Sequence, residues 1–145
     1  MLIDRDVPGK HASYKVGGML GAQNEFTHDS DLFQLAIESR SMFPQLSESL
    51  LNETSIDIQF HNSGLITIAN QESDVASLEH QYHFLTGKDS SVKQLNNEAL
   101  IHLTQGAVEP SYAAIHIPHD GQINAHNYTC LLYTSDAADD SLRVD

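Results

Sequence analysis

Apolar and polar residues follow two different spacings along the chain, and together they predict a mixture of helices and strands. Between Ser30 and Leu50, apolar residues recur three, four and seven apart with one wider gap, as on one face of a helix. Asp29, Ser30 and Asp31 can each cap the start of this helix, and Pro44 is expected to kink it or divide it in two. The predicted apolar stripe consists of Leu32, Leu35, Ala36, Met42, Phe43, Leu46 and Leu50.

Strict alternation follows the long helix. Ile56, Ile58 and Phe60 alternate with polar residues, and a second apolar run begins at Leu65, directly after a turn-like segment that ends in Gly64. Two apolar runs joined by a short turn that contains glycine are typical of a β-hairpin. Residues 56–68 are therefore predicted to form one.

The rest of the chain continues this mixture. A helix is predicted over 72–86, closed by Gly87, and Asn96 is expected to cap a short helix. That short helix should carry Ala99, Leu100 and Leu103 on one side. Further expected elements are strands at 1–6, 91–95 and 113–118, a turn at 119–122 and the first turns of a helix at 123–129. The predicted fold class is α/β, with an α+β arrangement in these 145 residues. An opening strand without a partner and a closing helix without an end lead us to expect a piece of a larger protein.

Charge and composition narrow the function classes. The formal net charge is −13, whereas nucleic-acid binding calls for the opposite balance, so no nucleic-acid partner is expected. No apolar run approaches the length of a membrane span, and the N-terminus shows no signal-peptide pattern. The single cysteine rules out an internal disulfide, so a reducing, cytoplasmic setting is the default expectation.

Histidine pairs are the first candidates for chemistry. His80 and His83 lie three apart in a predicted helix, and His116 and His119 lie three apart in a strand and turn. Such pairs can share a metal, but nine histidines in the chain make them common by chance, and no third ligand follows at a motif spacing. No metal site is predicted, and the G-x-S-x-G segment of serine hydrolases is absent from the sequence.

A more specific signal combines Asp4 with a glycine-rich segment. Asp4 ends a short apolar strand, where a dinucleotide-binding unit places the acid that binds ribose hydroxyls. Gly17 and Gly18 allow the backbone to approach a flat ligand or a phosphate, and a helix that begins near Ser13 would point free N–H groups toward it. A close helix crossing would explain the two glycines equally well.

The segment 1–26, "MLIDRDVPGKHASYKVGGMLGAQNEF", resembles the FAD-dependent D-amino-acid-oxidase superfamily, and most closely the glycine oxidases of thiamine biosynthesis. The likeness continues through "DLFQLAIESRSMFPQL", through "SIDIQ" with the later Gly64, and through "AVEPSYAAIHIPHDGQINAHNYT". It implies an incomplete Rossmann-like FAD-binding domain in residues 1–55. Part of a substrate domain, with a return strand and helix, is implied for residues 56–129.

The resemblance assigns a cofactor role to seven residues. Asp4 would hold the adenosine ribose with Arg5 beside it, and Ser13 would use its hydroxyl as well as its backbone. The expected cofactor-binding residues are Asp4, Arg5, Ala12, Ser13, Gly17, Gly18 and Met19. The family grips the substrate carboxylate with residues of its C-terminal half, so no catalytic residue is assigned here, and the 145 residues alone are expected to be inactive.

The implied reaction of the complete protein is flavin-dependent oxidation of glycine. The product is an imine that hydrolyses to glyoxylate and ammonia, and oxygen reoxidises the flavin with release of peroxide. The implied partners are FAD, a small amino acid and oxygen, and a homo-oligomer of the complete protein is compatible with the family. The alternatives are a sarcosine oxidase or D-amino-acid dehydrogenase of the same superfamily and, from another class, a non-enzymatic acidic α+β binding module.

Residues 130–145 differ in character from what precedes them. Cys130 to Asp140, "CLLYTSDAADD", can be encoded by TGT CTC TTA TAC ACA TCT GAC GCT GCC GAC GAY, which resembles the end sequence of transposase-based sequencing libraries. We therefore expect a non-native, adapter-derived tail that is helical at most to Ser135 and disordered beyond it. Its removal is expected to change stability by no more than about 0.5 kcal/mol.

Overall fold

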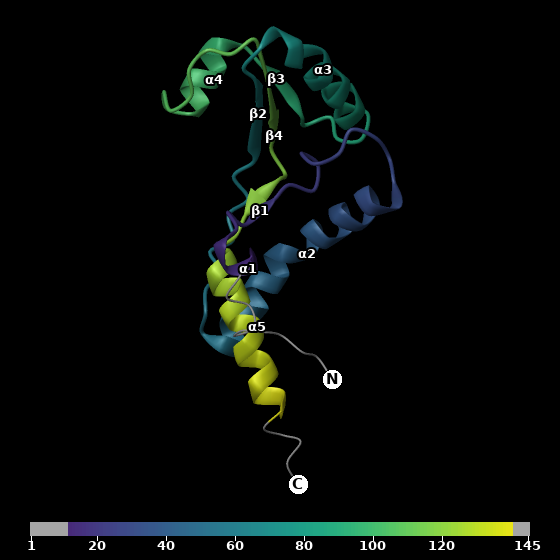
Figure 1. Cartoon of the computed structure of the whole chain (residues 1–145). Coiled ribbons are helices and arrows are strands. Elements are labelled where there is room, and N and C mark those ends of the chain that lie inside the picture. Colours follow the sequence, from purple (N-terminus) through teal and green to yellow (C-terminus); the bar gives the residue numbers. More distant parts are fainter. Residues whose placement is uncertain (1–11, 141–145) are drawn as a thin grey trace. The chain divides into compact units, whose positions relative to one another are not determined.

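The computed structural model describes residues 12–140, with side chains up to Leu132, and the chain forms two compact units (Figure 1). Both units are discontinuous in sequence. Among the described residues, unit 1 comprises 12–20, 41–61 and 122–140, and unit 2 comprises 21–40 and 62–121. The mixed α and β class is confirmed, and the expected division into an FAD-binding part at 1–55 and a substrate-domain part at 56–129 stays a prediction.

Unit 2 is built on a three-stranded antiparallel sheet in the order β2-β4-β3 (Figure 1). The strands are β2 (Leu65–Ala69), β3 (Lys93–Leu95) and β4 (Ala113–Ile117), so the two predicted strands at 91–95 and 113–118 are confirmed. Helix α3 (Glu72–Thr86) packs on the sheet and closes at Gly87, as predicted. The buried core of this unit consists of Ala69, Leu78, Leu85, Val92, Ile115 and Ile117.

Helix α4 (Asn97–Leu103) begins as its sequence predicts. The side chain of Asn96 accepts a hydrogen bond from the backbone N–H of Ala99 at 2.8 Å, which satisfies one of the free donors at the helix start. Leu100 is fully buried, whereas Leu103 is exposed, so the expected apolar side of this helix is covered only in part.

The predicted hairpin at 56–68 is wrong. Strand β2 pairs with β4, and residues 56–60 form no strand. Asp57 instead makes a local turn, since its carboxylate accepts a hydrogen bond from the N–H of Gln59, which has a positive φ of 51°. Ile58 is fully buried in the core of unit 1, so its burial, rather than pairing with β2, accounts for the alternation.

Helix α2 (Asp31–Thr54) decides between alternatives that the prediction left open. It runs through Pro44 as one helix and is not divided in two. Of the three predicted caps, Ser30 is the one that acts at the helix start, because its hydroxyl accepts from the N–H of Phe33 at 3.1 Å. The predicted stripe is only partly buried, since Leu32, Leu35 and Met42 are exposed. Phe33, which the stripe omitted, is the buried residue of the helix and packs edge-on against Phe26 and Phe84 in unit 2.

Unit 1 has a separate apolar core. Its buried residues are Ile58, Ile123 and Leu131, with Phe43, Tyr128 and others packed around them. Three short elements occur here: helix α1 (Ala12–Lys15), strand β1 (Met19–Leu20) and strand β5 (Gly121–Gln122). Strand β1 pairs with β5, and helix α5 (Ala125–Asp140) follows β5 along the chain. Asn124 caps α5 by accepting from the N–H of Asn127 at 3.0 Å, in agreement with the helix predicted there.

Two findings bear on the C-terminal segment. Leu131 is fully buried in the core of unit 1, so truncating this side chain should cost stability, whereas the expectation for residues 130–145 as a whole stays a prediction. Helix α5 extends to Asp140 and does not end near Ser135. Burying a leucine side chain is worth roughly 1.5–3 kcal/mol, which exceeds the effect expected for an unpacked tail.

Candidate cofactor site

Five of the seven residues expected to contact a cofactor lie within the described part of the chain. Asp4 and Arg5 lie outside the described residues, so the predicted ribose contacts stay predictions. Ala12 and Ser13 form the start of α1, and Gly17, Gly18 and Met19 lead from it into β1. The structure thus brings these five together in one continuous segment of unit 1.

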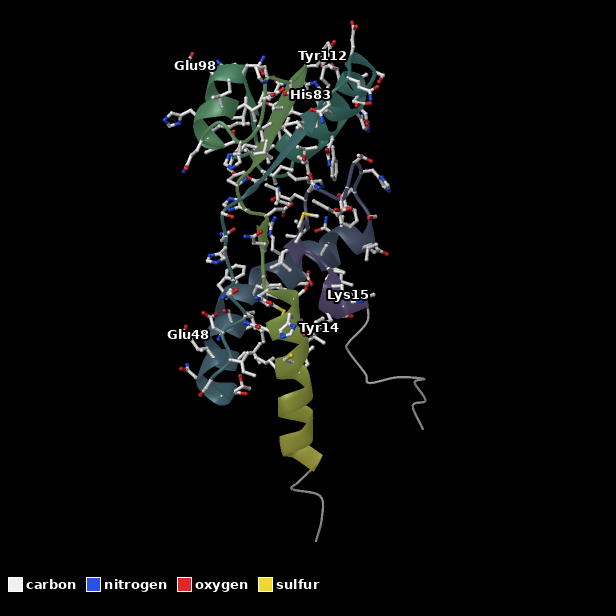
Figure 2. The ribbon with its side chains drawn as sticks, turned by 60° about the vertical axis from the view of Figure 1, so that its left-hand side comes forward. Tyr14, Lys15, Glu48, His83, Glu98 and Tyr112 are labelled. Carbon is white, nitrogen blue, oxygen red and sulfur yellow. The ribbon has the colours of Figure 1, made fainter. Side chains whose placement is uncertain are left out.

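Helix α1 is held against α5 by an aromatic contact. The ring of Tyr14 lies 4.0 Å from the ring of His126, measured between centroids, with the planes tilted by 60° (Figure 2). Ala12 and Ser13, which directly precede Tyr14, are exposed. The backbone and hydroxyl of Ser13 are therefore accessible to a ligand, as the cofactor role requires.

Gly17 and Met19 present open surface. A Cβ added to Gly17 would meet no atom within 4 Å, and Met19 is 64% exposed. Gly17 also borders a cavity of about 370 Å³. The cavity is lined by Tyr14, Val16, Gly17, Gln59, His61, Gln122, Ile123, Asn124, Ala125 and His126, all within unit 1.

Gly18 is a glycine for a different reason. Its φ is +71°, and an added Cβ would lie 2.0 Å from the backbone oxygen of Ile123. The Gly18 carbonyl also accepts a hydrogen bond from the N–H of Ile123 at 2.9 Å. Close approach of two protein backbones therefore accounts for this glycine without a ligand, although it is not the helix crossing considered as the alternative, because neither Gly18 nor Ile123 lies in a helix.

A buried polar cluster in unit 2 was not predicted from the sequence. The carboxylate of Asp120, fully buried, accepts from the backbone N–H groups of Gln23 at 3.1 Å and Asn24 at 2.8 Å. The guanidinium of Arg40 donates to the same carboxylate at 2.6 Å and to the side-chain oxygen of Gln23, also at 2.6 Å. The negative charge of Asp120 is thereby paired and hydrogen-bonded, as a buried charge must be.

Asp89 extends the cluster. It accepts from the Gln23 side-chain nitrogen at 3.0 Å and from the N–H and hydroxyl of Ser91. Burial by itself raises the pKa of Asp89, but the hydrogen bonds from Ser91 and Gln23, with the nearby His119, outweigh it and bring the pKa below the ordinary value of 3.8. The ionised form of Asp89 is therefore favoured in the folded chain.

Two weak sequence signals point to this cluster in retrospect. Arg40 is the only Lys or Arg in the 24 residues of α2, and Asp120 stands before Gly121 in a predicted turn. Neither signal identifies the partner, because Arg40 and Asp120 lie 80 residues apart.

The histidines and carboxylates form no candidate metal centre within residues that the structure describes: no three ligand-type side chains come together there. His116 lies in the central strand β4 opposite Lys93. Burial, and secondly the charge of Lys93, lower its pKa from the ordinary 6.5. Among the described helices, none is long and apolar enough to cross a membrane.

Comparison with known proteins identifies the class. Residues 1–138 match the family described as FAD dependent oxidoreductase, and the chain belongs to this family. Among its relatives, the glycine oxidase of Geobacillus kaustophilus (strain HTA426) is 37% identical over 132 residues. That alignment covers 90% of this chain and 35% of the relative, so the chain spans about a third of the length of the curated relative. The family match extends past Cys130, and the origin of residues 130–145 stays a prediction.

Solved structures agree with this assignment. The crystal structure of glycine oxidase from Geobacillus kaustophilus superposes with a TM-score of 0.79 at 36% identity, covering 83% of this chain and 33% of that one. Glycine oxidase from Bacillus cereus ATCC 14579 gives a TM-score of 0.77 at 28% identity, covering 87% and 33%. The expected superfamily resemblance is confirmed.

Proposed function

We propose that the chain forms part of an FAD-dependent amino-acid oxidase whose substrate is glycine. The observation that carries the proposal is the open segment around Gly17 and Met19, in a chain 37% identical to a glycine oxidase over 132 residues. An exposed methionine beside an open glycine offers an apolar, Cβ-free surface of the kind that suits a flat ring.

The described residues fit an FAD site in part. Ala12 and Ser13 would hold the cofactor through backbone groups and the Ser13 hydroxyl, and Gly17 and Met19 would lie along its ring system. Gly18 would act indirectly, by fixing the backbone against Ile123. Asp4 would bind the ribose, with Arg5 beside it. When bound, FAD supplies the redox chemistry by accepting a hydride from the substrate Cα and passing its electrons to oxygen.

The overall reaction would convert glycine, oxygen and water to glyoxylate, ammonia and hydrogen peroxide. The chain's own residues would position the cofactor, whereas the groups that grip the substrate carboxylate would come from the part of the family's length that these 145 residues do not span. The corresponding cellular role would be that of a cytoplasmic enzyme in thiamine thiazole synthesis.

The test uses the complete gene product. Under anaerobic conditions, glycine should bleach the flavin absorbance of the purified protein, and admission of oxygen should restore it with release of peroxide. Sarcosine and D-proline serve as competing substrates, and the highest kcat/KM is expected for glycine. A purified protein without flavin would contradict the whole proposal, and a flavoprotein that prefers sarcosine would contradict its substrate.

A further inference from the structure

The segment Gly21–Phe26 begins two residues after Met19 and belongs to neither a helix nor a strand. Its internal backbone hydrogen bonds are those of a turn: the N–H of Glu25 donates to the carbonyl of Gly21, and that of Phe26 to the carbonyl of Gln23. Such a turn leaves several backbone groups without a partner, and groups buried in this way need partners elsewhere. Ala22 and Gln23 are indeed buried.

Those partners come from distant parts of unit 2. The Gln81 amide, on α3, donates to the carbonyls of Asn24 at 2.6 Å and Phe26 at 3.3 Å, and the Thr67 hydroxyl, on β2, donates to the Asn24 side chain. The carboxylate of Asp120, which follows β4, accepts hydrogen bonds from two further backbone N–H groups of the turn, those of Gln23 and Asn24. Side chains from separate elements thus converge on one short turn.

Asp120 differs from the other partners because it is charged and fully buried. An ion in that position is costly unless every oxygen is satisfied, and an uncharged residue could have filled the same space. Its two oxygens are fully used: one accepts from Arg40 and Gln23, and the other from Gln23 and Asn24. A fully satisfied buried polar network favours one conformation over near alternatives.

We propose that Asp120, neutralised by Arg40, is a positioning residue of the oxidase: it holds Gly21–Phe26, the segment that follows Met19 along the chain, in one conformation. This inference rests on the proposed function. It assigns Asp120 and Arg40 no contact with substrate or cofactor.

The first test measures the turn itself. In the 145-residue chain, Asp120→Asn replaces one acceptor oxygen by an N–H₂ donor, which then faces either the backbone amides or Arg40. Amide hydrogen exchange at Gln23 and Asn24 should accelerate about tenfold or more, the scale of a lost hydrogen bond to a charged group. The matched control is Asp29→Asn, which removes the exposed ion pair of Asp29 with Lys88 in the same unit and should leave both amides unchanged.

Amides of Leu85 and Ile115 in the core of unit 2 serve as an internal reference. Acceleration confined to the turn supports the proposal, and equal acceleration in the core would overturn it, because Asp120 would then be a general stabiliser. If Asp120→Asn does not fold, Arg40→Lys decides by the same readout. It keeps the charge but loses the planar group that reaches Asp120 and Gln23 together.

The second test uses the flavin-loaded complete protein. Asp120→Asn and Arg40→Lys should each lower kcat for glycine, about tenfold for the first, and shift the flavin absorbance spectrum, with activity normalised to bound flavin. Unchanged kinetics and spectrum per flavin would overturn the positioning role. Failure of the proposed function would be visible separately, as a wild-type protein without flavin or without glycine oxidation.

Discussion

At the scale of single residues, the adjacent Gly17 and Gly18 are explained by two unrelated physical requirements. Both read alike in the sequence, as positions that allow a close approach. In the structure, Gly17 faces open space, whereas the missing side chain of Gly18 would collide with the backbone of Ile123, more than 100 residues later in the chain. Sequence reasoning predicted that the pair matters but could not separate the two roles, because the separating atom belongs to a distant segment.

The pair therefore predicts opposite outcomes for substitution. Gly17→Val should leave thermal stability nearly unchanged, since no atom lies within 4 Å of an added Cβ, but should weaken FAD binding to the complete protein by about tenfold, or roughly 1.4 kcal/mol. Gly18→Ala should destabilise the fold by more than about 1 kcal/mol, because alanine at a positive φ is strained and its Cβ meets Ile123. Thermal denaturation and flavin titration of both variants check this; Gly17→Val with unchanged flavin affinity would remove Gly17 from the site.

The polar cluster around Asp120 marks the limit of residue-level prediction. A buried Asp–Arg pair produces no repeating spacing in the sequence. Asp120 stands in a predicted turn, and Arg40 stands on a helix face that otherwise looks uncharged in the sequence. Only the fold brings Arg40 and Asp120 to 2.6 Å. By contrast, the helix caps at Ser30, Asn96 and Asn124 depend on residues within three positions, which is why the sequence was sufficient to place helix starts there.

At the scale of elements, most helices and strands could be predicted, and the pairing of strands could not. Alternation at 56–60 is the same whether the residues face a sheet partner or fill a core without pairing. Ile58 fills the core of unit 1 and β2 pairs within unit 2, so a hairpin between them was wrong, although the alternating residues Ile56 and Phe60 do pack against the same core as Ile58.

Strand β4 gives unit 2 a pH-dependent stability. The lowered pKa of His116, caused by burial and then by Lys93, means that the folded chain disfavours its protonated form. This contribution is fully present above pH 6.5, the value in the unfolded chain, and is lost as pH falls through the lower folded pKa. Urea unfolding at several pH values should show stability that declines below 6.5. His116→Gln should flatten this decline, whereas His28→Gln, at an exposed position, should retain it; an identical decline in both variants would assign it to other groups.

Helix α5 allows a direct test of how the leucines that follow Cys130 contribute to stability. Leu131 is fully buried and Leu132 is 47% exposed, so neighbouring leucines on one helix provide a matched pair. Leu131→Ala should lower the free energy of unfolding by about 2–5 kcal/mol, and Leu132→Ala by no more than about 0.5 kcal/mol. Urea denaturation measures both values. Small and equal changes in the free energy of unfolding would support the prediction that residues 130–145 form a tail that packs against nothing.

At the scale of the whole molecule, the evidence for family membership is different from the evidence for activity. Residues 1–138 match the FAD dependent oxidoreductase family, yet the chain spans only about a third of the glycine oxidases it resembles. The resemblance was readable in the sequence because it lies in local motifs around Gly17–Ala22 and Asp120. The arrangement of two discontinuous units was not, since it depends on which distant segments share a core.

This difference leads to a prediction for the 145-residue chain by itself. Purified alone, it should neither retain FAD through gel filtration nor release peroxide with glycine. The sequence contains no G-x-G-x-x-G phosphate turn, and the family resemblance implies that the carboxylate-binding residues belong to the part of the family's length that these residues do not span. It should also tend to associate, since β2 and β3 are the edges of the described three-stranded sheet and carry open hydrogen-bonding groups. Absorbance of the eluted protein, a peroxide assay and light scattering test the three statements, with the complete gene product as the control. A yellow, peroxide-producing chain would mean that these 145 residues contain a sufficient catalytic site, and the division of labour proposed between them and the rest of the family's length would be wrong.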